Sequence, residues 1–382
     1  MLKFLIALIV LGAIVFCLGL NWYLKKKFIN IWIGDYLRRL IKGKPKVEGP
    51  VHLMVMVVDH FELNGHEDRL IAWKETYPRI VDQFRDADGH KPQHTFFYAL
   101  DLLHEHELEA LQPLVEQGYG EFELHWHHAH DTSETFVQKL QEVMPIFQKY
   151  GYMKPIEPGK LACFSFIHGN WSLDNSRGSE FCGVDNEIQL LQELGCYADF
   201  TFPALFQPAQ PKYINSIQYA VDNGCAKSYD KARVSKVGEA SKDNEFMIFQ
   251  GPLTINWLDW RHKWHPQFED GDLHAQATHG DPKRIDAWVR QAIHVEGRPE
   301  WQFIKLFSHG AQDHKSLAGP ATAKMFSHFQ NKYNDGTKYV LHYVNAREAY
   351  NIVKAAEDGL SGNPNDYRDY KIPHPLKRDG LA

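Results

Sequence analysis

The chain has 382 residues, 44% of them hydrophobic and 24% charged, a balance that is ordinary for a globular protein able to bury a sizeable core. Its formal net charge of −6 leaves no basic excess to neutralise a phosphate backbone, so nucleic acid is not expected as a partner. The five cysteines are odd in number and include no C-x-x-C pair, which argues against a disulfide framework or a zinc knuckle.

Residues 1–24 have the composition of a membrane anchor. Phe4 to Leu24 carry no charge, and about 20 apolar residues in a helix cross a hydrocarbon core of roughly 30 Å. A cleaved signal peptide would have a shorter apolar region followed by small residues, whereas Trp22 and Tyr23 form an aromatic pair typical of a membrane interface. We therefore expect a retained, single-pass helix in the inner (cell) membrane.

Residues 25–50 form a basic juxtamembrane segment. Its lysines and arginines follow the apolar helix, so the positive-inside rule places the rest of the chain in the cytoplasm. Apolar residues such as Phe28, Trp32 and Tyr36 alternate with these charges. Two interpretations are equally open: the segment lies along an anionic membrane surface, or it is an ordinary helix packed on the following domain.

From residue 51 the chain alternates short β-rich runs with helical stretches, which is typical of successive βα units around a parallel sheet. The β-rich runs are 51–60, 94–100, 121–127, 161–168, 197–202, 246–251 and 303–309, with an eighth candidate at 339–344. Seven or eight such units predict an α/β fold with one barrel over residues 51–360.

Helices are expected at 133–150, opened by a capping box of Asp131 and Glu134, and at 347–358, closed by Gly359. The stretches 204–245 and 257–280 show little periodicity and are expected to form loops. Residues 361–382, rich in proline, glycine and charge, are expected to form an extended tail.

Polar residues collect where several of the β-rich runs end. The ends read Asp59-His60-Phe61-Glu62 in the first run, His125-Trp126-His127-His128-Ala129-His130-Asp131 in the third, His168-Gly169-Asn170-Trp171 in the fourth and Ser308-His309-Gly310 in the seventh. In a β/α barrel, functional groups come from the carboxyl ends of the strands. The sequence therefore predicts one site built from these segments.

The third run carries the strongest metal signal. Side chains alternate along a strand, so His125 and His127 point into the barrel while the apolar residues between them face the helices. Two imidazoles on one face can reach a single ion, and His130 can turn back from the following loop as a third ligand. A purely structural interpretation leaves four histidines within six residues unexplained. We therefore expect a divalent metal site here.

Asp59 ends a run of valines and methionines, where an unpaired carboxylate is costly. A metal or another cation nearby would offset that cost. From the residues alone Asp59 is a metal ligand or a general base, and the alternative is a helix cap or a turn former.

The motifs VVDHFE, ELHWHHAHD, HGNW, GCYADFTFP and FSHG, in this order, resemble those of the polysaccharide deacetylases, a family of carbohydrate esterases. The resemblance covers most of residues 51–355 and implies a distorted (β/α)7–8 barrel of the polysaccharide deacetylase type. It implies that Asp59 is the catalytic base and His309 the general acid, with His60 and His125 in metal-ligand positions. The expected site comprises catalytic Asp59 and His309, metal ligands His60, His125, His127 and His130, supporting Glu62, His168 and Asp199, and substrate-binding Trp171, Trp257 and Trp260.

The activity implied by the resemblance is hydrolysis of N-acetyl groups on an amino sugar, carried by a glycan or a lipid-linked precursor. The implied cofactor is a divalent ion, with zinc expected. Trp257 and Trp260 are placed to stack on sugar rings, although tryptophans more often serve as packing.

Three departures from the family pattern bear on activity. His60 stands where the family has a second aspartate, the HWHHAH run is more compact than the usual histidine spacing, and Ile167 or His168 replaces an arginine. These departures support a catalytically silent, membrane-tethered glycan-binding or assembly protein as the alternative. Glycoside hydrolysis, a third interpretation, needs two carboxylates at strand ends, for which Glu62 and Asp199 are the candidates.

Overall fold

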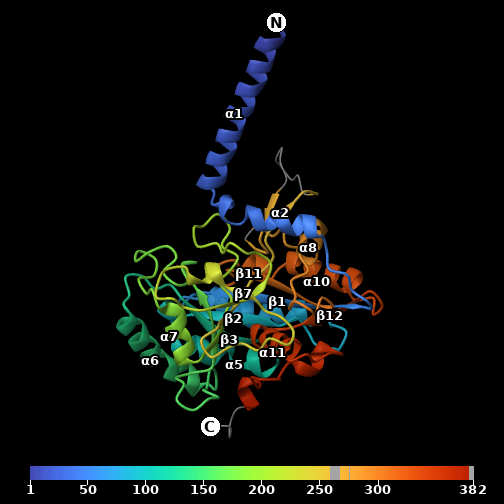
Figure 1. Cartoon of the computed structure of the whole chain (residues 1–382). Coiled ribbons are helices and arrows are strands. Elements are labelled where there is room, and N and C mark those ends of the chain that lie inside the picture. Colours follow the sequence, from blue (N-terminus) through green and yellow to red (C-terminus); the bar gives the residue numbers. More distant parts are fainter. Residues whose placement is uncertain (259–266, 275, 378–382) are drawn as a thin grey trace.

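The computed structural model describes residues 1–258, 267–274 and 276–377 (Figure 1). α1 (Leu2–Lys26) is a single helix without buried residues that projects away from the body of the protein. It is long and apolar enough to cross a membrane, a property that anchors share with signal sequences. Trp260, predicted to bind substrate, lies outside the described residues.

The juxtamembrane segment forms a helix, α2 (Ile33–Lys42), that packs on the domain. Trp32 and Tyr36 are buried against Ile214 and Leu253. Of the two interpretations left open by the sequence, the structure therefore shows the packed helix. Other apolar side chains of α2 remain exposed on its outer face.

All eight β-rich runs predicted from the sequence form strands of one central sheet. These strands are β1 (Val51–Phe61), β2 (His94–Ala99), β3 (Gly120–Trp126), β4 (Phe164–His168), β5 (Cys196–Asp199), β8 (Phe246–Phe249), β11 (Trp301–Ser308) and β12 (Tyr339–Tyr343). They are parallel in the order β11-β1-β2-β3-β4-β5-β8, and β12 pairs with the first half of β1. Their carboxyl ends therefore lie at one edge of the sheet.

Four further strands have two to four residues each. β6 (Ile217–Ala220) and β7 (Arg233–Val234) extend the sheet beyond β8 in antiparallel pairing, and β9 (Thr254–Asn256) pairs with β10 (Gln267–Glu269). β6, β7 and β10 lie in segments predicted as loops. These three strands show no clear period in the sequence, and they have two to four residues each.

The hydrogen-bonded path of the sheet runs from β11 to β7 and, among the described residues, does not close on itself. Lys305 in β11 nevertheless reaches across the sheet, where its Nζ donates to the backbone carbonyls of Phe200 and Phe202 that follow β5. The sheet is therefore strongly curved. The structure establishes a mixed α/β domain with a central parallel sheet, and the residues it describes do not show a closed barrel.

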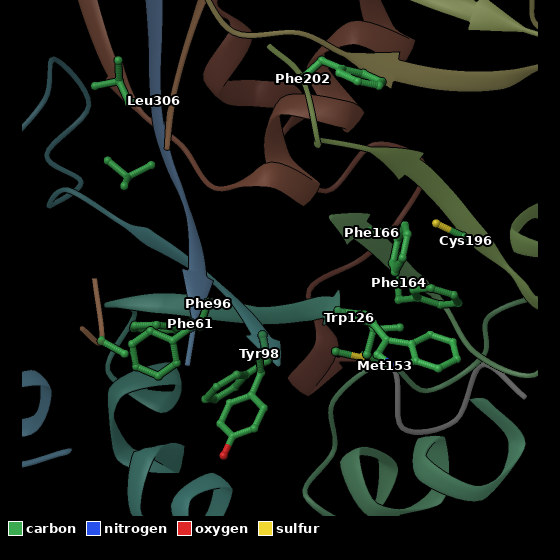
Figure 2. Close-up of a cluster of buried hydrophobic side chains, with 14 of the residues drawn as sticks. Phe61, Phe96, Tyr98, Trp126, Met153, Phe164, Phe166, Cys196, Phe202 and Leu306 are labelled. Atoms are coloured by element: carbon green, nitrogen blue, oxygen red, sulfur yellow. The ribbon is translucent and has the colours of Figure 1, made fainter. Parts of the chain in front are cut away.

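Two hydrophobic clusters flank the sheet. The helices are α3 (Glu67–Ile71), a π-helical turn (Ala72–Thr76), α4 (Tyr77–Val81), α5 (Glu105–Glu116), α6 (Ser133–Lys149), α7 (Glu187–Leu194), α8 (Pro282–Val289), α9 (His314–Leu317), α10 (Pro320–Tyr333) and α11 (Ala346–Glu357). Residues of α4 to α10 pack with Phe122, Leu124 and Trp126 of β3, and Figure 2 shows part of this cluster. α11 packs on the other face, with Met54 and Met56 of β1. The predicted alternation along β3 is confirmed.

The capping box of α6 lies one residue later than predicted. The N-cap is Thr132, whose side chain accepts from the backbone N–H of Thr135 at 3.3 Å, while the Thr135 hydroxyl accepts from the N–H of Thr132 at 2.9 Å. Asp131, predicted as the cap, instead accepts a hydrogen bond from the Thr135 hydroxyl at 2.8 Å. Threonine and aspartate are both good caps, so the sequence alone does not choose between them.

Residues 361–377 pack on α11 instead of forming the expected extended tail. Arg368 and Ile372 are buried, and the Arg368 guanidinium donates to Glu348 at 2.8 Å. Asn351 donates to the carbonyls of Arg368 at 2.6 Å and Ile372 at 2.8 Å. The composition of this segment predicted a tail because composition contains no information about contacts between distant residues.

A buried ion pair fixes the start of β3 to the start of α11. Arg347 donates from Nε and Nη2 to the two carboxylate oxygens of Glu121, each over 2.8 Å, and both side chains are buried. Arg347 also donates from Nη1 to the carbonyl of Ile372 at 2.8 Å. Removing Arg347 would leave the buried Glu121 carboxylate without its main counter-charge.

We predict that Arg347→Ala lowers the free energy of unfolding by roughly 3–5 kcal/mol, because the Glu121 carboxylate stays buried without its partner. Urea titration of the full chain in detergent, followed by circular dichroism, measures this loss. Arg79→Ala is the matched control, because its pair with Glu75 is exposed and 3.9 Å long, and it should cost less than about 1 kcal/mol. Equal losses in the two variants would contradict the importance of the buried pair.

Candidate metal centre

Residues from three strand ends converge at the carboxyl edge of the sheet. His60 and Glu62 lie at the end of β1, His125 and His127 at the end of β3, and His309 follows β11. β1 and β11 stay paired in parallel up to their carboxyl ends, so the residues that follow the two strands lie at the same edge of the sheet. The convergence follows directly from the strand order.

Glu62, His125 and His127 direct donor atoms at one another and are called the triangle below. Oε1 of Glu62 lies 3.3 Å from Nε2 of His125 and 3.4 Å from Nε2 of His127, and the two nitrogens are 3.3 Å apart. Ligands bound at about 2.0–2.2 Å in a tetrahedral shell are separated by roughly 3.3–3.6 Å. The triangle therefore has the dimensions of three ligands of one zinc-sized ion.

Each histidine of the triangle is held through its other ring nitrogen. Nδ1 of His125 lies 3.2 Å from the carbonyl oxygen of Ile167, and Nδ1 of His127 lies 3.2 Å from Oδ2 of Asp101. With a metal bound, these contacts would keep the ring proton on Nδ1 and leave the Nε2 lone pairs directed at the triangle. Metal-binding histidines typically have such outer hydrogen bonds. Asp101 was not predicted as a site residue, although it follows β2 and the strand-end rule applies to it equally.

The carboxylates set the charge of this group. Burial raises the pKa of Glu62, but hydrogen bonds from His125 and His127 outweigh burial and hold that pKa well below its usual range. Burial lowers the pKa of His127, but Asp101 and Glu62 outweigh burial and raise that pKa to about 9. Without a metal, His127 is protonated at neutral pH, and a bound cation must displace this proton. Metal affinity should therefore rise with pH up to about 9.

A group of aromatic rings adjoins the triangle. The ring centroid of His60 is 4.6 Å from that of His125, 4.7 Å from His309 and 5.1 Å from Trp171. Donor atoms of His60, Glu62 and His309 lie within 4.8 Å of one another. His60 is buried, and its Nδ1 has no hydrogen-bond partner in the described chain, whereas His309 is half-buried. These rings can supply a further ligand or groups that transfer protons.

Asp59 lies on the opposite face of β1 from His60. Its Oδ2 is 2.8 Å from Nε2 of His94, and its Oδ1 accepts the backbone N–H of Gly310 at 2.5 Å. A Cβ at position 310 would lie 2.1 Å from Oδ2 of Asp59, so this turn requires glycine. The carboxylate therefore holds the turn that carries His309, and it does not join the donor atoms around Glu62.

His130 does not join His125 and His127. The backbone at His130 has a φ of 56°, its N–H donates to the carbonyl of Ser179 at 2.7 Å, and its exposed ring contacts the Ser179 hydroxyl at 3.3 Å. The loop after β3 thus turns away from the triangle at this residue. Glu62, expected only to support the site, occupies the third position.

The remaining predicted residues lie apart from the triangle. Asp199 is buried, and its two carboxylate oxygens accept the N–H and the hydroxyl of Thr201. Trp257 is exposed and donates from Nε1 to the hydroxyl of Tyr36 in α2 at 2.7 Å. His168 belongs to a second group of donor atoms, described below.

No family model and no curated protein matches the chain. Among solved structures, the chain is similar to the 4-alpha-glucanotransferase from Thermococcus litoralis, with 10% sequence identity and a TM-score of 0.40. The match covers 77% of this chain and 39% of the glucanotransferase chain. A similarity at this level carries no information on activity, so functional inference rests on the residues of the site.

We predict that Asp101→Asn weakens metal affinity by about 10–100-fold, because an amide stabilises the Nδ1 proton of His127 less than a carboxylate does. Equilibrium dialysis of the full chain in detergent against buffered zinc measures the affinity. His130→Ala is the matched control and should leave it unchanged. A greater loss in His130→Ala than in Asp101→Asn would restore His130 as a ligand and reject the triangle.

Proposed function

We propose that the chain is a metal-dependent deacetylase of the polysaccharide deacetylase type, which hydrolyses N-acetyl groups on an amino sugar. The observation that carries the proposal is the triangle, in which three donor atoms lie 3.3–3.4 Å apart and both histidines have outer hydrogen bonds. The order of the sequence motifs supports the same family. The curved parallel sheet is compatible with the distorted (β/α)7–8 barrel of that family.

The donor set suits zinc, because two imidazoles and one carboxylate form a catalytic zinc shell that keeps one position for water. A divalent ion held there would polarise the amide carbonyl and lower the pKa of a water molecule. Gln312 donates to Oε2 of Glu62 and so keeps Oε1 turned toward His125 and His127. The protein thus fixes the orientation of all three ligands.

His309 is the group that would protonate the leaving amine. Its turn is rigid, because the N–H of Gly310 donates to Asp59 and the carbonyl of Gly310 accepts from Nε1 of Trp73 at 3.1 Å. The ring of Trp171 lies 5.8 Å from that of His309 and offers an apolar wall for a sugar ring. Asp59 then acts as a positioning residue. The general base would then be His60, whose Nδ1 has no hydrogen-bond partner among the described residues and would accept the proton of the attacking water.

We predict that His309→Ala keeps its metal and lowers the rate of acetate release by about 10²–10⁴-fold, the usual contribution of a general acid. Asp59→Asn should lose much less, because asparagine can still accept the N–H of Gly310 and donate to His94. Both variants are compared with the wild type for metal content and for acetate release from a panel of acetylated amino sugars.

Other outcomes of these measurements would change the roles assigned to the residues or to the protein. Loss of metal from His309→Ala would make His309 a ligand. Loss of turnover by orders of magnitude in Asp59→Asn, with the metal retained, would make Asp59 the base that the family resemblance implies. A wild-type protein that binds metal and glycan but releases no acetate would support the silent glycan-binding alternative.

The position of α2 favours a lipid-linked substrate over a soluble polymer. α2 packs on Ile214 and Leu253, in the loops that follow β5 and β8, and the candidate site lies at the same carboxyl edge of the sheet. α1 directly precedes this segment and projects from the body beside α2 (Figure 1), so a membrane spanned by α1 would lie on the side of the domain that carries α2. Lys25 and Lys26 at the end of α1 favour a catalytic domain on the cytoplasmic side.

We predict that the reconstituted full chain deacetylates a lipid-linked sugar in its own vesicles at least about 10²-fold faster than the same substrate in separate vesicles, because a shared membrane raises the effective concentration. Acetate release is measured at equal total lipid and substrate. The soluble form of the sugar is the matched control, and its rate should not depend on how the vesicles are prepared. Equal rates for the lipid-linked sugar in the two arrangements would reject a membrane-bound substrate.

A further inference from the structure

The histidine-rich segment after β3 supplies a second group of donor atoms. His128 follows His127 in the chain but points to the helical layer, where its ring lies 5.1 Å from Phe136 of α6. There it meets His168 at the end of β4, Cys182 in the following loop and Glu187 at the start of α7. Donor atoms of these four side chains lie within 4.8 Å of one another, and all four residues are buried.

We propose that His128, His168, Cys182 and Glu187 form a second, structural zinc site. One thiolate, two imidazoles and one carboxylate make a complete tetrahedral shell for zinc. The sulfur disfavours magnesium and calcium, which prefer oxygen ligands. Four protein ligands leave no position for a substrate, so the site differs in kind from the triangle.

The distances centre on Glu187. Its Oε1 lies 2.9 Å from Nε2 of His128 and 3.8 Å from Nε2 of His168, and its Oε2 lies 3.6 Å from Sγ of Cys182. His168 is fully buried, and its Nε2 has no hydrogen-bond partner in the part of the chain that the structure describes. A buried nitrogen of this kind is costly, and a cation in the group would supply its partner.

The outer contacts of the two histidines differ. Nδ1 of His128 lies 3.3 Å from a carboxylate oxygen of Asp131, within ion-pair distance but without a hydrogen bond. Nδ1 of His168 accepts the N–H of Asn170 at 3.2 Å, so ligation through Nε2 requires the ring proton to move to Nδ1 and this hydrogen bond to be lost. A single neutral hydrogen bond is much weaker than binding of a structural zinc ion, so this requirement does not oppose the site.

A hydrogen-bonded network without metal is the competing explanation. Protonated His128 would pair with Glu187, and the Cys182 thiol would donate to the other carboxylate oxygen. This network leaves Nε2 of His168 buried without a partner, whereas a zinc ion would supply that partner.

A zinc ion here would fix the loop between β4 and α7. The backbone N–H groups of His130 and Asp131 already donate to the carbonyls of Ser179 and Cys182, at 2.7 and 3.0 Å. The same loop carries Trp171, whose ring faces those of the candidate catalytic site. The second site would therefore position one wall of the first without touching substrate.

The test is the zinc content of the full chain, purified in detergent, loaded with zinc and freed of loosely bound metal. We expect two equivalents in the wild type and one in each of Cys182→Ser and His125→Ala. Cys196→Ser is the matched control, because Cys196 is also buried, with Sγ 3.5 Å from the carbonyl of Ala198, but belongs to no such donor group among the described residues. It should keep two equivalents.

Cobalt substitution gives a readout that can be measured on the wild type alone, so it does not depend on the folding of any variant. The wild type loaded with Co²⁺ should show a thiolate-to-cobalt charge-transfer band, which His125→Ala and Cys196→Ser keep and Cys182→Ser loses. Absence of the band in the wild type, or equal zinc content in the wild type and Cys182→Ser, would overturn the proposal. Neither measurement depends on acetate release, so failure of the proposed activity would leave this result standing.

Discussion

The alternation of side chains along β1 and β3 is the constraint on which both groups of donor atoms depend. Past the end of β3 it separates His127, which turns toward Glu62, from His128, which turns toward Glu187. On β1 it separates His60 from Asp59 in the same way. A shift of one residue in the register of either strand would move each of these side chains to the opposite face of the sheet, and the donor atoms would no longer meet. The tight pairing of β1 with three neighbouring strands opposes such a shift.

The strands and the orientation of His125 and His127 could be predicted because they depend on local patterns. Runs of β-branched and aromatic residues mark the strands, and the period of two assigns a face to each side chain. The third member of the triangle could not be predicted in this way. Glu62 is 63 residues from His125 in sequence, and it reaches the histidines only because the strand order places the ends of β1 and β3 on either side of β2.

The second group of donor atoms was even less predictable from the sequence than the triangle. Rules for cysteine search for spacing within a short segment, whereas Cys182 meets ligands from β3, β4 and α7. Residues 361–377 were expected to be extended for a similar reason, because composition cannot show that Arg368 reaches Glu348. In both cases the decisive contacts join segments whose proximity only the assembled sheet determines.

Both groups place a carboxylate beside buried or half-buried imidazoles, and positive charge is needed to compensate that carboxylate. Burial lowers the pKa of both His127 and His128, but Asp101 and Glu62 around the first, and Glu187 and Asp131 around the second, outweigh burial and raise each pKa to about 9. Without metal, protons supply the charge. Because these pKa values lie above the ordinary 6.5, the stabilisation from the protonated pairs is complete below about 6.5 and is lost as the pH rises through about 9. A bound divalent ion replaces the proton as the source of positive charge, and this charge is not lost when the pH rises. Metal binding should therefore contribute most to stability on the alkaline side, where protons no longer compensate the buried carboxylates.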